Sequence, residues 1–119
     1  MSALIILSTC PHEVATEIAR KIVQKKLAAC VNILPQVQSI YRWHDAVEEN
    51  KESLLIIKSS KSCYSLLEQT ILELHPYETP EIVALPIVAG SATCLQWLLT
   101  SCKLPDLISA ENSDSDNQS

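Results

Sequence analysis

Glycine is almost missing from this chain, and its scarcity excludes several kinds of nucleotide site. The 119 residues contain one glycine, Gly90. Phosphate-binding P-loops and dinucleotide-binding loops need several glycines close together, because only glycine lets the backbone approach the phosphates. The sequence also has no G-x-S-x-G and no H-E-x-x-H motif, which mark serine hydrolases and zinc peptidases. We therefore expect a binding protein and not an enzyme.

Large aromatic side chains are also scarce, which restricts what the core can be made of. Phenylalanine is absent, and the aromatic residues are two tryptophans and three tyrosines. Hydrophobic residues nevertheless make up 47% of the chain. The sequence therefore predicts one aliphatic core in a single domain, which suits a chain of this length.

Basic residues are few, and the net charge of −5 is unevenly distributed. Four of the fourteen acidic residues lie in residues 106–119, where there is no Lys or Arg. Residues 1–105 therefore contain ten acidic and nine basic residues and are nearly neutral. Such a chain has no basic patch for nucleic acid or for an anionic membrane surface. We expect one domain over residues 1–105 and a disordered acidic tail over residues 106–119.

The cysteines and the first apolar run favour a cytoplasmic location. Five cysteines is an odd number, and none forms a C-x-x-C pair, so neither a disulfide framework nor a zinc knuckle is indicated. Residues 3–7 are apolar but too few for a signal sequence or a membrane span. We predict reduced cysteines in the cytoplasm, with no membrane association.

Hydrophobic periodicity predicts a β-α-β-β-α-β order followed by a short helix. The expected strands are residues 3–7, 27–34 continuing through 37–44, 53–58 and 82–88; the expected helices are residues 11–26, 64–74 and 92–102, with a polar turn over residues 45–51. This is the α+β, ferredoxin-like arrangement, in which two helices cover one face of a mostly antiparallel sheet. Because the strands are apolar nearly throughout, we expect self-association to cover the other face.

Several segments in this order resemble the CutA divalent-cation-tolerance family. They are T-C-P at residues 9–11, K-L-A-A-C-V-N at 26–32, S-I-Y-R-W at 39–43, I-K-S at 57–59 and H-P-Y-E-T-P-E-I at 75–82. The resemblance implies a ferredoxin-like protomer in a tight PII-like homotrimer, and a link to copper and divalent-cation tolerance. Two positions depart from the family pattern: Asp45 stands where the family often has glycine, and Ser8 where some relatives have cysteine.

Five side chains are candidate ligands for Cu or Zn. Cys10 and His12 form a C-x-H pair at a predicted helix start, while His75, Glu78 and Glu81 lie in a loop stiffened by two prolines. Thiolate and imidazole suit soft or borderline metals, and a helix N-terminus lowers the pKa of a thiol. The alternatives are that Cys10 packs in the core with His12 exposed, and that the loop is only a rigid connector.

A second group of residues is predicted to form interfaces or clefts between subunits. Tyr41, Trp43, Pro76 and Tyr77 are the expected interface anchors, with a pocket as the alternative for Tyr41 and Trp43.

Lys58 and Cys30 are candidates for a ligand cleft, against the alternatives of a surface lysine and a core cysteine.

These observations together lead to two candidate functions. The first is a cytoplasmic homotrimer that binds divalent or soft metal ions. The second is a PII-like signalling or scaffold trimer that binds a small anionic ligand at subunit clefts.

Overall fold

Four antiparallel strands form a single sheet in the order β2-β3-β1-β4. The structure, a computed structural model, describes residues 2–105, so the predicted tail over 106–119 lies outside the described residues. The elements are β1 (Ala3–Cys10), α1 (His12–Gln24), β2 (Cys30–Trp43), β3 (Ala46–Ser60), the short 3-10 helix η1 (Lys61–Cys63), α2 (Tyr64–Leu74), β4 (Ile82–Pro86) and α3 (Ala92–Ser101). The predicted α+β class and order of elements are confirmed.

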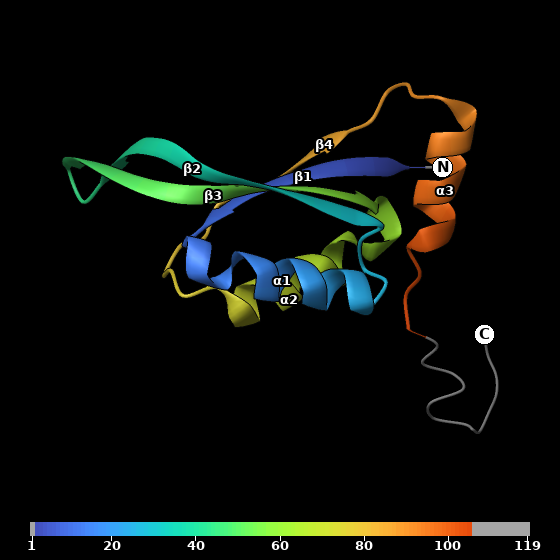
Figure 1. Cartoon of the computed structure of the whole chain (residues 1–119), viewed down its shortest axis with the longest axis horizontal. Helices are drawn as coiled ribbons and strands as arrows, with labels where there is room; N and C mark the ends of the chain where they lie inside the picture. Colours follow the sequence, from blue (N-terminus) through green and yellow to red (C-terminus); the bar gives the residue numbers. More distant parts are fainter. Residues whose placement is uncertain (1, 106–119) are drawn as a thin grey trace.

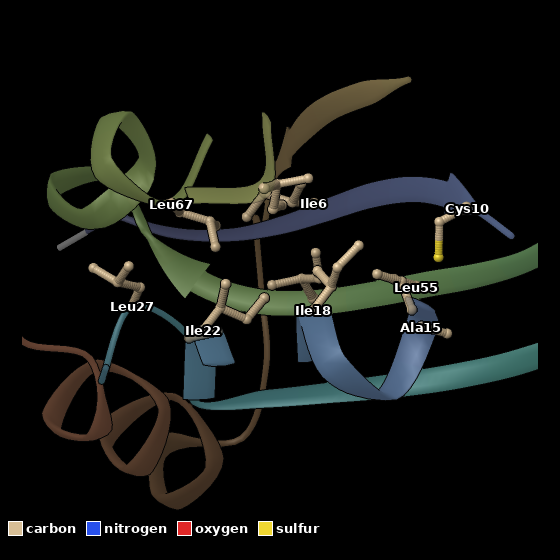
Figure 2. Close-up of a cluster of buried hydrophobic side chains, with 11 residues drawn as sticks. Ile6, Cys10, Ala15, Ile18, Ile22, Leu27, Leu55 and Leu67 are labelled. Carbon is tan, nitrogen blue, oxygen red and sulfur yellow. The ribbon is translucent and has the colours of Figure 1, made fainter. Parts of the chain in front are cut away.

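Helices α1 and α2 lie side by side on one face of the sheet, while α3 stands at one end of it (Figure 1). In α1 the apolar residues recur every three or four positions, so Ile18 and Ile22 point together toward the strands. They pack with Ile6 of β1, Leu55 of β3 and Leu67 of α2, all fully buried (Figure 2). The core is aliphatic, as the composition predicts.

None of the helices in residues 2–105 is both long enough and apolar enough to cross a membrane.

The hairpin of β2 and β3 turns earlier than the sequence predicts. The turn is formed by His44 and Asp45, with φ angles of 50° and 67°, and β3 already begins at Ala46. Two successive positive φ angles are typical of the type I′ turn that joins twisted strands. Residues 46–51, of which 48–51 are polar, still form a strand, because this half of the hairpin extends beyond the helices and its side chains are exposed.

Two further boundaries differ from those expected. Strand β1 continues to Cys10, and α1 begins at His12 with Pro11 as its N-cap rather than within its first turn. Strand β2 is continuous past Pro35, with a register irregularity between Leu34 and Val37. Because the irregularity absorbs residues 35 and 36, the predicted segments 27–34 and 37–44 belong to one strand instead of two.

The face of the sheet away from α1 and α2, here called the open face, is largely apolar. Alternation along each strand and the pairing register assign it these apolar residues: Ile5, Leu7, Leu34, Leu54, Ile56, Val83 and Leu85. Leu34, Val83 and Leu85 remain 42%, 46% and 50% exposed. The sequence-based expectation that two helices cannot cover both faces therefore holds for the described chain.

Ser8 is a local defect in the buried face of β1. Its side chain is fully buried, and its hydroxyl has no hydrogen-bond partner within residues 2–105. Since an unpaired buried hydroxyl costs about 1–3 kcal/mol, we expect Ser8→Ala to raise the free energy of unfolding by about 1 kcal/mol in urea denaturation.

Ser59→Ala is the matched control for that substitution. The Ser59 hydroxyl is equally buried but donates to the carbonyl oxygen of Leu27 at 2.5 Å. Its removal is expected to lower the stability, because it leaves that carbonyl without its partner. A loss of stability in both variants would contradict the assignment of Ser8 as an unpaired group.

Candidate functional site

A cleft of about 770 Å³ lies between the β2–β3 hairpin and the loop that precedes β4. Residues 38–43 of β2 form one wall and residues 77–81 form the other, with Thr9, Asn50 and Glu52 between them. Small-molecule sites usually occupy about 300–1,000 Å³. The cleft therefore has room for a small organic molecule as well as for an ion.

The least exposed polar side chain of this cleft is Glu52. Glu52 is only 5% exposed, and its Oε2 accepts a hydrogen bond from the Tyr77 hydroxyl at 2.8 Å. Burial and the hydrogen bond to Glu52 raise the pKa of Tyr77, so the phenol keeps its proton. Beside this pair the Asn50 amide nitrogen donates to the Tyr41 hydroxyl. The cleft thus contains a carboxylate whose position is fixed by a neutral tyrosine.

His75 holds the cleft loop against β1. It is 7% exposed, and its Nε2 donates to the Thr9 carbonyl oxygen at 2.7 Å. Its Nδ1 accepts the backbone N–H of Tyr77 at 3.2 Å. Because both ring nitrogens are used, His75 has no free lone pair for a metal in this arrangement. His75 therefore positions the loop.

The predicted C-x-H pair separates in the structure. Cys10 is fully buried in the aliphatic core, whereas His12 is exposed and its Nδ1 lies 2.8 Å from the Ser53 hydroxyl oxygen. Burial, together with the carboxylates of Glu52 and Glu13, raises the pKa of the Cys10 thiol to about 11. The expectation of a lowered thiol pKa is wrong, because desolvation and nearby negative charge oppose the thiolate.

This environment predicts an order of cysteine reactivity. With a pKa of about 11, about one thousandth of Cys10 is thiolate at pH 8. Cys63 is buried too, whereas Cys94 is exposed. We expect iodoacetamide at pH 8 to modify Cys94 first and to reach Cys10 and Cys63 only after unfolding in urea, as followed by peptide mass mapping. Rapid modification of native Cys10 would contradict the buried thiol.

The remaining candidate residues fall in two places. Glu78 and Glu81 are exposed and line the cleft, where the Thr9 hydroxyl donates to Glu81 Oε1 at 3.5 Å. Pro76, also exposed, stands in the same loop. Tyr41, Trp43 and Tyr77 line the cleft as well. For Tyr41 and Trp43 this is the position that the pocket alternative expects.

Lys58 and Cys30 are neighbours on the open face, away from that cleft. Lys58 Nζ donates to Asn32 Oδ1 at 3.1 Å, and the Cys30 thiol lies 3.7 Å from the same oxygen. No group of three or more His, Cys, Asp or Glu side chains within residues 2–105 is placed to hold a metal ion. The predicted metal ligands therefore do not converge within a single chain.

Sequence reasoning missed Glu52, Asn50 and Thr9 as cleft residues. The available signal was the position of Glu52, an acidic residue two positions before the apolar run over residues 54–57. Its significance depends on Tyr77, which is 25 residues away and approaches it only in the folded chain.

The fold and the cleft define the class of the protein. It is a ferredoxin-like α+β protein, and one solved structure that it resembles is described as the PII-like protein CutA from Nostoc sp. PCC 7120, in apo form. That structure has a TM-score of 0.81 at 36% identity, over 88% of this chain and 100% of the other. The sequence model of the CutA1 divalent ion tolerance protein family matches residues 4–101. The chain belongs to this family.

Individual relatives agree with this assignment. The human protein CutA is 48% identical over 91 residues, which is 76% of this chain and 51% of the human one. The chain therefore spans about half the length of this mammalian relative. The solved divalent cation tolerance protein of Thermus thermophilus has a TM-score of 0.83 at 44% identity, over 85% of this chain and 99% of that one.

Proposed function

We propose that the protein is a homotrimer that takes part in divalent-cation tolerance and holds a divalent or soft ion, such as Cu or Zn, at a site completed by a neighbouring subunit. The observation that carries the proposal is the open face, where Val83 and Leu85 leave about half of their surface in water. Exposed apolar patches of this kind mark association surfaces. A ring of three chains covers every copy of the open face and leaves no unpaired surface for further growth.

The carboxylates of Glu78 and Glu81 are the candidate donors in the cleft that remain available for the ion. Cys10 is enclosed in the core and His75 uses both ring nitrogens, so neither presents a ligand to the cleft. Glu78 and Glu81 are exposed in the cleft loop. Oxygen donors alone favour harder ions, so binding of Cu or Zn requires a nitrogen or sulfur donor from the adjacent subunit.

Metal titration followed by native mass spectrometry tests this proposal. We expect stoichiometric uptake of Zn²⁺ or Cu²⁺ by the trimer, and its loss when Glu78→Gln and Glu81→Gln are combined, because the amides carry no charge. The control combines Glu17→Gln with Glu73→Gln, two exposed residues on α1 and α2. Unchanged uptake in the first variant would refute the cleft carboxylates as ligands, and loss of uptake in Cys10→Ala alone would return the assignment to that thiol.

A second candidate function is the binding of a small anionic ligand between subunits. It is favoured by Lys58, whose ammonium group lies on the apolar open face with Asn32 as its hydrogen-bond partner. Enclosing this charge in an assembly requires a counter-charge. Stabilisation of the protein by a nucleotide or organic anion without metal, lost in Lys58→Met, would support this function.

We also propose that the protein acts in the cytoplasm by binding rather than by catalysis. All five cysteines are free thiols, which is the usual state in a reducing compartment.

A further inference from the structure

We infer that the cleft binds a small organic molecule through a primary ammonium group, with Glu52 as its counter-charge. This site shares the cleft with the carboxylates proposed for the metal ion and does not depend on metal binding. The inference rests on the charge of the cleft, the burial of Glu52 and the mixture of aromatic and polar groups around it.

The cleft has the charge that attracts a cation. Its lining contains three carboxylates, from Glu52, Glu78 and Glu81, against one guanidinium, from Arg42. A concave surface with an excess of one charge concentrates ligands of the opposite charge. A cationic ligand is therefore favoured over an anionic one at this site.

Glu52 is placed as a specific partner and not only as part of a negative surface. Glu52 is only 5% exposed, yet it lines the cleft. The Tyr77 hydroxyl occupies Oε2, which leaves Oε1 as the oxygen that can accept from a ligand. A carboxylate removed from water is costly unless a charged or strongly donating group pairs with it, and an ammonium group supplies both.

The surrounding groups fit an ammonium better than a bare metal ion. A metal needs several oxygen, nitrogen or sulfur ligands that converge on one point, and residues 2–105 provide no such group of three. An ammonium instead needs acceptors for its N–H groups, and the side chains of Asn50 and Thr9, which also line the cleft, carry oxygens that can accept.

The walls of the cleft fit the carbon part of such a molecule. Tyr41, Trp43 and Tyr77 are 38%, 37% and 37% exposed, and all three line the cleft. Aromatic faces bury an alkyl chain and also attract a cation held near the ring. The volume of about 770 Å³ is far more than one ion requires.

The test is calorimetric titration of the full chain with n-butylammonium and with 1,4-diaminobutane, in a chelator that removes divalent metals. Tetramethylammonium, which has the charge without N–H donors, and butanol, which has the chain without the charge, are the reference ligands. We expect both amines to bind, tetramethylammonium to bind at least about tenfold more weakly, since it makes no charge-assisted hydrogen bond, and butanol not to bind.

Glu52→Gln and Glu68→Gln form the matched pair of variants. Glu68 Oε2 also accepts from a tyrosine hydroxyl, that of Tyr64 at 3.2 Å, but it lies on α2 away from the cleft. Glu52→Gln is expected to weaken amine binding about tenfold or more, because a charge-assisted hydrogen bond is lost, and Glu68→Gln is expected to leave it unchanged. Equal losses in the two variants, or no loss in Glu52→Gln, would overturn the inference.

A second measurement keeps the inference testable if Glu52→Gln does not fold. In the unmodified protein, the side-chain amide signals of Asn50 should shift on addition of either amine and stay in place with butanol. No shift at saturating amine, or no heat of binding for either amine, would refute the site. Because the chelator is present throughout, a failure of the metal proposal does not alter these outcomes.

Discussion

Leu85→Glu is expected to convert the proposed trimer into monomers. Leu85 lies in β4 on the open face and is 50% exposed in the single chain, so a glutamate there has little effect on the fold of one subunit. In the assembly the same carboxylate loses its water, and Lys58, the lysine of the open face, is kept two strand spacings away from it by β1. An unpaired buried charge costs about 3–5 kcal/mol at each site, and a symmetric ring repeats that cost in every subunit.

Sedimentation velocity at micromolar concentration measures the outcome, with Leu72→Glu as the control. Leu72 is 48% exposed, almost the same as Leu85, but it belongs to α2 on the opposite side of the sheet. The control should remain a trimer. If Leu85→Glu also stays trimeric, or if the unmodified protein is a folded monomer, the open face is not the association surface.

His75→Ala is expected to destabilise the fold by about 2–4 kcal/mol. The substitution removes the hydrogen bond from Nε2 to the Thr9 carbonyl and the bond that the Tyr77 N–H makes to Nδ1. Each lost bond costs about 1 kcal/mol, and a buried group left without a partner adds about 1–3 kcal/mol. The loop that carries Tyr77 then loses its attachment to β1.

His12→Ala is the matched control for the histidine experiment. His12 also makes one side-chain contact, to Ser53 at 2.8 Å, but it is exposed, so water replaces the lost partner. Its expected cost is below about 1 kcal/mol. Urea denaturation of both variants decides the matter, and equal stabilities would show that His75 does not anchor the loop.

The order of the elements could be predicted from the sequence because each one carries a strong local pattern. The apolar spacing of Ile18 and Ile22 defines α1, and the run over residues 53–58 defines the buried half of β3. Residues 46–51 have no such pattern, because no core packs on them. Their strand conformation comes from pairing with β2 and from the left-handed turn at His44 and Asp45.

The candidate site was only partly predictable, for a related reason. The motif over residues 75–82 marks the correct loop, but it does not show that His75 faces inward and bonds to Thr9, which is 66 residues away in the sequence. A cysteine at a predicted helix start suggests a reactive thiol. In the structure, however, Cys10 is the last residue of β1, and the alternation along that strand places its side chain in the core. The role of Glu52 depends on a tyrosine from another element, and no local pattern shows such a pairing.

The position of β1 in the centre of the sheet has a consequence for the order in which the chain acquires its structure. Leu4 pairs with Ser59 on one side and with Pro86 on the other, so β1 is synthesised well before both of its partners. Among the strand pairs within residues 2–105, only β2 and β3 are joined by a short loop. Contacts between distant segments slow folding because the intervening chain must be ordered first. During synthesis β1 therefore stays without its second neighbour until β4 has left the ribosome. Until then one edge of β1 is unpaired and its apolar residues are not fully covered.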